Sequence, residues 1–359
     1  MSLSLRLSIL SIFFIFCSAS AAVAQDWQSV FDRGLEEFRT GRFAQAEQTF
    51  RAANRLNSEV PEGYFNLGLA LFRQKKYVAA TTAFGEAIRQ RPRYAKAQIQ
   101  LGTALELSGN YAGAIAAFAA AEKLEPDNAV IFYERGLAHR NANKYPAAIA
   151  QFRRAVEIDP KYKAAYNELA RLLDRTKAED EAVQYYEKVA DLDPKDSHAQ
   201  QRIGDHLLRQ RKYKEAAMQY KIAIALEPNN AGAQLGLGAA YYNDANYADA
   251  VAPYETAANL DPRSVQPVVY LADAYRMQRK FPDAKATYLR ALKIDPKSAE
   301  SLYWLGAIAA TEQNITLARQ YHTRLKPIDA ARAAKLLEFI TPKYGSRTAT
   351  RFIVTMEFW

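Results

Sequence analysis

An alanine recurs at every thirty-fourth position through most of the chain, and this spacing constrains the fold more than any other feature of the sequence. The series has no insertion: Ala46, Ala80, Ala114, Ala148, Ala182, Ala216, Ala250, Ala284 and Ala318. With each alanine at the twentieth place of a unit, the series defines nine units of 34 residues across 27–332. Units of this length pack on their neighbours in an array rather than forming separate globular domains.

Three further places of the unit repeat with the alanine. An aromatic residue follows four places later in eight units, with His322 in the ninth: Phe50, Phe84, Phe118, Phe152, Tyr186, Tyr220, Tyr254 and Tyr288. The eighth place is a small residue in every unit: Gly34, Gly68, Gly102, Gly136, Ala170, Gly204, Gly238, Ala272 and Gly306. A proline ends seven units: Pro92, Pro126, Pro160, Pro194, Pro228, Pro262 and Pro296. Apolar residues return every three to four positions within each half, which predicts two amphipathic helices per unit.

The repeated residues also predict how the helices meet. Small residues at the eighth and twentieth places let the two helix backbones approach, and we expect the aromatic ring to fill the space between adjacent units. Acidic residues before the prolines, such as Asp159 and Asp261, are interpreted as turn residues rather than catalytic carboxylates. Five residues are predicted to cap the first helix of the following unit: Asn128, Asp196, Asn230, Ser264 and Ser298.

This pattern closely resembles the tetratricopeptide repeat family over about 85% of the chain. The resemblance implies an all-α fold, a right-handed superhelical solenoid whose first helices line a concave groove, and it implies that the groove binds peptide segments or other proteins. Some family members clamp a carboxylate with residues on three successive first helices. Only Asn66 and Lys96 match that clamp, so this ligand is not assigned.

Residues 1–24 form a predicted signal peptide. Arg6 precedes the apolar run from Leu7 to Phe16, and small residues lead to a predicted cleavage site after Ala24. The alternative is an uncleaved anchor, but the apolar run is about ten residues and a membrane span needs about twenty. The only cysteine, Cys17, leaves with the signal, so the mature chain has no thiol. We therefore expect an exported protein, in the periplasm or secreted further.

The C-terminal end and the seventh unit depart from the repeat. Residues 333–344 predict a cap helix with Leu336, Leu337, Phe339 and Ile340 turned inward, and 345–359 form an apolar tail that folds back or awaits a partner. In the seventh unit, Pro253 falls inside the second helix, and Gly236 weakens the first helix. A kink is expected there, either as a hinge or as a local irregularity.

The concave groove follows from the resemblance, which assigns the second, fifth, sixth, ninth, twelfth and thirteenth places to its lining. Its N-terminal part is mainly apolar: Phe31, Leu35, Phe38, Phe65, Leu69 and Phe72, beside Asn66 and Arg73. Further along it is mixed and charged: Asn167, Arg171, Arg175, Arg202, Asp205, Arg209, Asp273 and Arg276, before Tyr303 and Trp304. This lining suits an extended peptide with apolar and polar contacts. Alternatively, the N-terminal aromatic residues bury one another, pack against residues before Trp27, or form a dimer interface.

Basic residues gather where the first helices are expected to end, in a chain of net charge +9. The clearest members of this basic edge are Lys75, Lys76, Arg211, Lys212, Arg279 and Lys280. They suggest a second function, the binding of an anionic glycan or lipid of the cell envelope. The alternative is that cations simply suit helix C-termini.

The sequence offers no catalytic constellation and no phosphate-binding glycine loop. His198 and His206 lie eight residues apart without further ligand residues, so no metal or other cofactor is expected. No motif for reading nucleic acid is present. The sequence thus predicts a non-enzymatic scaffold or adaptor that binds a peptide or protein in its groove and helps assemble an envelope complex. It leaves the oligomeric state open.

Overall fold

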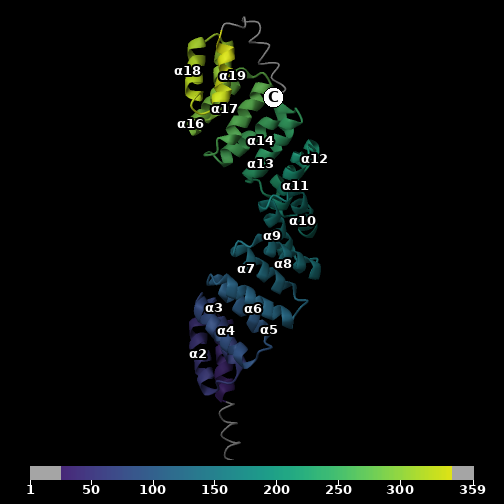
Figure 1. Ribbon diagram of the computed structural model, residues 1–359, viewed down its shortest axis with the longest axis vertical. Helices are drawn as coiled ribbons and strands as arrows, with labels where there is room; N and C mark the ends of the chain where they lie inside the picture. The colour runs from purple at the N-terminus through teal and green to yellow at the C-terminus, as the bar shows by residue number, and fades with distance from the viewer. Residues whose placement is uncertain (1–25, 342–359) are drawn as a thin grey trace, which may run out of the picture. The chain divides into compact units, whose positions relative to one another are not determined.

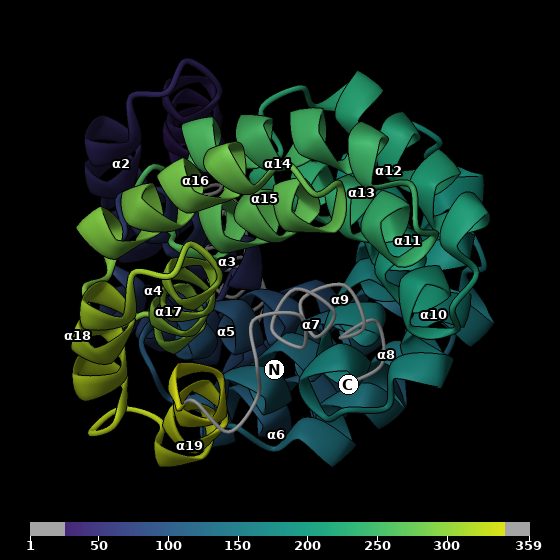
Figure 2. The ribbon, with the colours of Figure 1, turned by 90° about the horizontal axis from the view of Figure 1, so that it is seen from above.

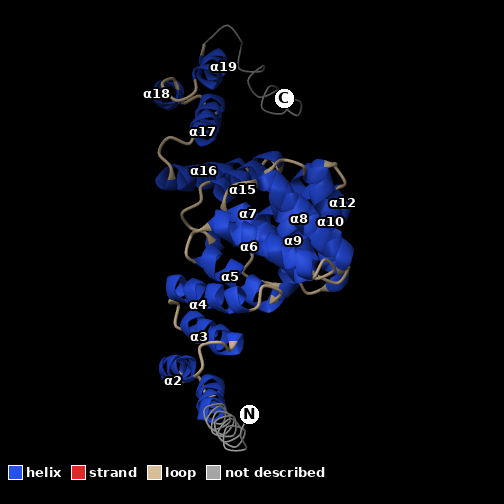
Figure 3. Cartoon of the chain, turned by 60° about the horizontal axis from the view of Figure 1, so that its bottom comes forward, coloured by secondary structure: helices blue, strands red, loops and turns tan. Residues whose placement is uncertain are grey.

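The computed structural model describes residues 26–341, and the described chain consists of helices joined by short loops, with no strand (Figures 1 and 3). Residues 26–39 are helical. The following helices are α2 Phe43–Leu56, α3 Pro61–Arg73, α4 Tyr77–Gln90, α5 Ala95–Leu107, α6 Tyr111–Leu124, α7 Ala129–Asn141, α8 Tyr145–Ile158, α9 Lys163–Arg175, α10 Glu179–Leu192, α11 Ser197–Arg209, α12 Tyr213–Leu226, α13 Ala231–Asn243, α14 Tyr247–Leu260, α15 Gln266–Met277, α16 Phe281–Ile294, α17 Ala299–Thr311, α18 Ile315–Leu325 and α19 Ala330–Ile340.

The predicted all-α repeat fold is confirmed, because each 34-residue unit supplies a first and a second helix. The first helices are 26–39 and the odd-numbered helices α3 to α17, and the second helices are the even-numbered helices α2 to α18. The predicted signal peptide and apolar tail lie outside the described residues. The chain divides into two compact units, Met1–Ala178 and Glu179–Trp359, called here the N-terminal and C-terminal units.

A contact between the small residue at the eighth place and the aromatic ring at the twenty-fourth place holds the helices of a repeat together. A Cβ atom added to Gly102 would lie 2.6 Å from the ring of Phe118, and one added to Gly68 would lie 2.5 Å from the ring of Phe84. The rings of both phenylalanines are fully buried. The ring therefore rests directly on the backbone of the first helix, at a distance that a methyl group would prevent.

The same rings also reach the next repeat, as the sequence predicts. Tyr220 contacts Gly204 of its own repeat, and a Cβ atom added to Gly236 of the following repeat would lie 2.4 Å from the Tyr220 ring. Gly236 thus has a packing role, which outweighs its low helix propensity. The Tyr254 ring likewise lies against Tyr270 of the next repeat, with 5.6 Å between ring centroids.

The turn inside each repeat has one residue in the left-handed backbone region. These residues recur at the same place and all have positive φ angles: Gly41, Lys75, Gly109, Asn143, Lys177, Arg211, Ala245, Arg279 and Gln313. The next amide donates back to a carbonyl five residues earlier, as from Lys76 N to Leu71 O at 3.0 Å. This is the geometry that ends a helix sharply, and glycine adopts it most readily. The chain accepts seven other residues there, so packing of the two helices determines the turn.

Capping and turn predictions are confirmed in part. The side chains of Asn128, Asp196 and Asn230 accept backbone hydrogen bonds at the starts of α7, α11 and α13, as predicted. The prediction is wrong for the two serines. Helix α15 begins after Val265 without a side-chain cap, and Ser298 hydrogen bonds with Ser301 instead.

The acidic residues before the prolines act as turn residues. The carboxylates of Asp159 and Asp261 accept hydrogen bonds from the backbone N–H groups of Lys161 and Arg263, at 2.9 and 3.2 Å. Second helices end two residues before the repeat prolines, as α4 ends at Gln90 before Pro92. Helix α14 continues across Pro253 without interruption, and the kink expected there remains a prediction.

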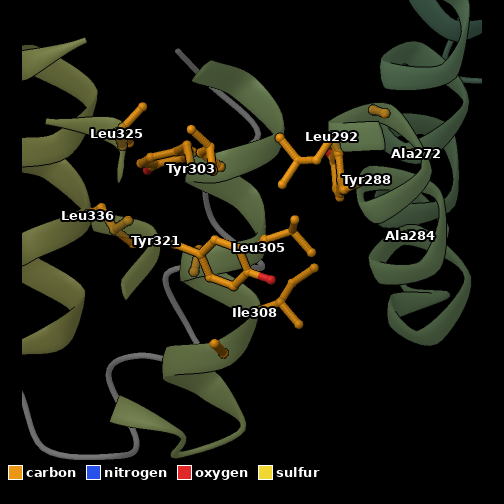
Figure 4. Close-up of a cluster of buried hydrophobic side chains, with 14 of the residues drawn as sticks. Ala272, Ala284, Tyr288, Leu292, Tyr303, Leu305, Ile308, Tyr321, Leu325 and Leu336 are labelled. Atoms are coloured by element: carbon orange, nitrogen blue, oxygen red, sulfur yellow. The ribbon is translucent and has the colours of Figure 1, made fainter. Parts of the chain in front are cut away.

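The last repeat replaces the aromatic contact with a leucine from the following helix. A Cβ atom added to Gly306 would meet the side chain of Leu336, at 2.5 Å, rather than that of His322. Helix α19 therefore covers the end of the array, and Figure 4 shows Leu336 with Tyr321 and Leu325 in the adjoining core. Leu336 and Ile340 are buried and Phe339 is partly buried, but the predicted inward orientation of Leu337 is wrong, because 41% of it is exposed.

Replacing a contact glycine tests this packing. We expect Gly102→Ala to lower the free energy of unfolding by about 1–2 kcal/mol, because the new methyl group displaces the Phe118 ring. The matched control is Gly85→Ala in α4, where an added Cβ atom meets nothing within 4 Å. Gly85→Ala should raise stability by about 0.5–1 kcal/mol through helix propensity. Urea denaturation measures both, and equal effects of the two substitutions would contradict the packing role.

Candidate concave binding surface

The first helices form the inner side of the curve within each unit. Successive first helices contact one another, α3 with α5, α5 with α7, and α11 with α13. Among the described residues, no two successive second helices are in contact as extensively as these pairs of first helices. A stack whose first helices are closer together must bend toward them. Figure 2 shows α5 and α7 inside α6 and α8, and α13 and α15 inside α12 and α14.

The predicted apolar part of the groove is more closely packed than the sequence suggested. Phe31 is buried and stacks on Trp27, with ring centroids 4.7 Å apart. Phe38 and Phe72 are half-buried, each against a ring of its own repeat, Phe43 at 5.3 Å and Tyr77 at 5.4 Å. The expectation that Phe31 lines an open groove is therefore wrong, and the alternative of mutual burial holds for it.

The other residues of this part lie at the rim of the N-terminal core. Leu35 and Leu69 are half-buried against that core. Phe65 packs between Phe84 and Tyr94, with centroids 5.8 and 5.1 Å away. Asn66 donates to the Glu62 carbonyl oxygen at 2.8 Å, and the exposed Arg73 guanidinium lies over the Phe43 ring. The surface thus offers ring edges and leucine side chains rather than a deep apolar slot.

The predicted polar residues lie in two places. Asn167 and Arg171 are on α9 in the N-terminal unit, and neither forms a hydrogen bond or ion pair with the described residues. Arg202 and Asp205 are on α11 in the C-terminal unit and form an ion pair of 2.7 Å. The Tyr220 hydroxyl donates to the other Asp205 oxygen at 2.8 Å. Burial raises the Asp205 pKa.

An acidic group in the N-terminal unit was missed by the sequence analysis. Glu106 on α5 is 9% exposed, and it accepts a hydrogen bond of 2.7 Å from the Asn141 amide. Burial, together with the nearby Glu134 charge, raises its pKa to about 7. Burial also raises the pKa of Glu134 on α7. Glu106 is at the twelfth place of its 34-residue repeat and Glu134 is at the sixth place of the next. Both places were assigned to the groove, so applying the groove assignment to every repeat would have found both residues.

Asp273 on α15 is the corresponding buried acid of the C-terminal unit. The Tyr288 hydroxyl donates to its Oδ1 atom, and Arg276 Nε lies 3.4 Å from the same oxygen. Burial raises the Asp273 pKa to about 6. The Arg276 guanidinium stacks on Trp304, 3.8 Å from the ring centroid.

The acids withdrawn from solvent, Glu106 and Asp273 buried and Glu134 and Asp205 half-buried, share one location in the repeat. Four described carboxyl groups have a raised pKa, those of Glu106, Glu134, Asp205 and Asp273. All four are on first helices, at places assigned to the concave face. Desolvated ionisable groups that packing does not require are typical of functional sites. The first-helix face of each unit is therefore the candidate site.

The residues of the predicted basic edge are all exposed and lie in the turns inside the repeats. Lys75, Arg211 and Arg279 follow first helices, where a cation favours the helix C-terminus. Lys76, Lys212 and Lys280 instead directly precede second helices, where the helix dipole disfavours a cation. Helix-end electrostatics therefore explains only half of the basic edge.

Other site types find no support in the part of the chain that the structure describes. That part contains no group of three or more metal-ligating side chains. His206 is buried beside Gln210, and the His198 ring meets the Tyr186 ring edge-on, with centroids 5.6 Å apart. Within residues 26–341, no helix combines the length and the apolar character that a membrane crossing requires.

Comparisons with known proteins agree with the geometry. Family models described as tetratricopeptide repeat match residues 31–84, 133–197 and 202–265, and also 71–132. A further model, described as TPR repeat, matches 272–310. The chain belongs to the tetratricopeptide repeat family. Among curated proteins, none matches this TPR protein at a significant level.

Several solved structures are similar to this TPR protein. The C-terminal part of a TPR repeat-containing protein from Cytophaga hutchinsonii is 18% identical with a TM-score of 0.56, and 68% of this chain and 99% of that chain are covered. YrrB, described as a TPR protein with an unusual peptide-binding site, is 21% identical with a TM-score of 0.48, covering 52% and 97%. Pseudomonas aeruginosa PilF is 21% identical with a TM-score of 0.48, covering 59% and 98%. Such identities show the fold alone.

The raised pKa of Glu106 predicts a pH-dependent stability for this TPR protein. The carboxyl group has an ordinary pKa of 4.5 when unfolded and about 7 when folded, so its protonation favours the folded state. That contribution is complete below about pH 4.5 and is lost as the pH rises through 7. Glu106→Gln, which is always neutral, should match the wild type at low pH and exceed it by roughly 3 kcal/mol at pH 8.

Chemical denaturation across this pH range measures the difference between the two proteins. The control is Glu157→Gln, which removes an exposed carboxylate of the same unit that pairs with Arg154 at 3.0 Å. At pH 8, the free energy of unfolding of Glu157→Gln should not exceed that of the wild type. A Glu106→Gln variant that is less stable than the wild type at pH 8 would contradict the assignment.

Proposed function

We propose that this TPR protein is a non-enzymatic adaptor that binds an extended segment of a partner protein along the first-helix face of its units. The observation that carries the proposal is the location of the four acids whose pKa is raised, two of them buried and two half-buried, all on that face. Burying a carboxyl group destabilises the folded protein, and packing in the core does not offset that cost. We therefore infer that these carboxyl groups serve a role other than stability. Carboxylates there can accept hydrogen bonds from the amide groups or cationic side chains of a bound segment.

Differences between repeats support this role. The eighth, twentieth and twenty-fourth places hold similar residues in successive repeats because they make the helix contacts. The ninth place instead varies freely, with Leu69, Thr103, Arg171, Asp205 and Ala239 in different repeats. The fold therefore does not specify the residues of the inner face, which are available for recognition of a particular partner.

We further propose that the protein acts in the periplasm. The predicted signal peptide at residues 1–24 supports export to the periplasm, where an adaptor would help assemble a complex of the cell envelope. Assembly of such a complex suits a long inner surface that makes many weak contacts.

Site-specific photo-crosslinking in cells tests both the surface and the location. A photoreactive phenylalanine at Asn167 on the inner face of α9 should give covalent adducts with a partner protein. The same residue at Val78, which is 72% exposed on the second helix α4 of the same unit, should give none. Fractionation of the same cells should recover the Asn167 adduct with the periplasmic proteins. Equal adducts at both positions would argue against an inner binding face, and a cytoplasmic adduct would argue against export.

A second candidate function is the binding of an anionic glycan or lipid by the basic edge. The observation in its favour is the exposure of Lys212 and Lys280 at helix N-termini, where the helix dipole disfavours them, whereas Lys76 at the same place pairs with Glu47 at 2.8 Å. Salt distinguishes the two functions. Binding to exposed cations should weaken steeply with ionic strength, whereas adducts formed at Asn167 should change little.

A further inference from the structure

The C-terminal unit contains a small pocket on its first-helix face. The pocket has a volume of about 250 Å³ and is lined by Ala239, Tyr242, Asn243, Tyr254, Tyr270 and Asp273. Pockets for whole small molecules commonly have volumes of about 300–1,000 Å³. This one is therefore suited to a single side chain rather than to a metabolite.

The pocket arises where one repeat departs from a pairing seen in its neighbours. In the sixth repeat, the Tyr220 hydroxyl donates to Asp205 at the ninth place, and in the eighth repeat, the Tyr288 hydroxyl donates to Asp273 at the ninth place. In the seventh repeat, the ninth place holds Ala239, a pocket-lining residue. The aromatic residue is again a tyrosine, Tyr254, and no acidic partner is available for it from its own first helix. The short alanine side chain leaves space at this point.

Polar atoms at the pocket lack partners among the described residues. The hydroxyl groups of Tyr242 and Tyr254 form no hydrogen bond there. The Oδ1 atom of Asp273 accepts hydrogen bonds from Tyr288 and Arg276, and its Oδ2 atom accepts no hydrogen bond from the described residues. Asp273 is 8% exposed and Tyr254 is 2% exposed, and none of these oxygen atoms is among the fully enclosed, unpartnered polar atoms of the described residues, so each retains a small accessible surface.

The chemistry of the lining favours a cation. Asp273 is the only charged residue among the lining residues, and its free oxygen accepts but does not donate. The rings of Tyr242, Tyr254 and Tyr270 add aromatic surface, and Tyr254 and Tyr270 lie at an interplanar angle of 52°. Aromatic rings beside a carboxylate attract ammonium and guanidinium groups through cation–π and charge-assisted contacts. Burial also raises the pKa of Tyr242 to about 12, so its hydroxyl stays neutral.

We propose that the pocket formed by Tyr242, Tyr254, Tyr270 and Asp273 binds a lysine or arginine side chain of the segment held on the first-helix face. This inference rests on the proposed function and adds a specificity to it. The cationic group would lie between the tyrosine rings and donate to Asp273 Oδ2 and to the Tyr254 hydroxyl oxygen. Arg276 does not compete for this position, because its guanidinium stacks on Trp304 and approaches the other oxygen of Asp273.

Selection from a random peptide library displayed on phage, with the mature chain immobilised, tests the pocket. Peptides enriched on the wild type should carry lysine or arginine at one shared position. Replacing that residue by norleucine should weaken binding by about ten- to a hundredfold, the loss expected for a charge-assisted hydrogen bond. The same replacement should have little effect on binding to Asp273→Asn, which already lacks the charge. This double-mutant cycle measures the direct coupling between the cation and Asp273.

Two further variants keep the test independent of folding effects. Ala239→Leu fills the pocket without changing Asp273 and should also abolish the preference for a cation. Asp244→Asn removes an exposed acid just after α13 and should change binding less than about twofold. Circular dichroism checks that each variant is folded.

The outcomes separate the pocket from the proposed function. Enriched peptides without a shared basic residue, or with no coupling to Asp273, would overturn the pocket assignment while leaving peptide binding intact. No enrichment of any peptide over an immobilised control protein would overturn both. Enrichment of basic peptides whose binding is weakened in Asp273→Asn and Ala239→Leu but kept in Asp244→Asn is the expected result.

Discussion

The contact of a large aromatic ring with a bare backbone is the constraint on which the rest of this structure depends. Where the eighth place is glycine, the ring of the twenty-fourth place reaches the backbone of the first helix directly, as Phe118 reaches Gly102. That contact fixes the distance between the two helices of a repeat, and rings such as Tyr220 extend it to the next repeat. Each repeat is thereby stacked on its neighbour, and the first helices come to lie on the inside of the bend.

The helix contacts also determine which residues are left for function. Places that hold the rings and small residues cannot change without loss of packing, whereas the sixth, ninth and twelfth places face inward and vary between repeats. Buried acids at these places, Glu106 in one unit and Asp273 in the other, are costly in a way that the fold does not explain. In the proposed function, these carboxyl groups hydrogen bond to a bound peptide segment. The proposed tyrosine pocket would make one part of the first-helix face specific for a lysine or arginine side chain.

Most of the fold was predictable because the same types of residue recur at the same places of each 34-residue repeat. The period, the helix pairs, the proline stops and three of five helix caps follow from residues whose effects are local. The left-handed turn residues were not predictable, because Lys75 or Ala245 have no preference for that conformation and adopt it only when two packed helices require it. The Ser264 cap failed for a similar reason, since α15 begins two residues later with Pro267 in its first turn.

The candidate site was predictable only in part. The rule taken from the family resemblance placed Asp205 and Asp273 on the inner face, and it would have placed Glu106 and Glu134 there if applied to every repeat. It could not tell that Phe31 is buried, because burial requires both Trp27, one turn earlier on the same helix, and Phe50 on α2, whose ring centroids lie 4.7 and 5.6 Å from that of Phe31. The pairing of Tyr220 with Asp205 was visible in principle, since the same two places hold Tyr288 and Asp273 two repeats later. The pocket at Ala239 is then found as the exception to that pairing.

A double-mutant cycle between Gly102→Ala and Phe118→Leu tests the central contact most directly. If the methyl group is harmful because it meets the ring, its cost should fall by about 1 kcal/mol when the ring is replaced by leucine, as measured by urea denaturation of the four proteins. An equal cost of Gly102→Ala in both backgrounds would show that the ring and the glycine act independently, and would contradict the account.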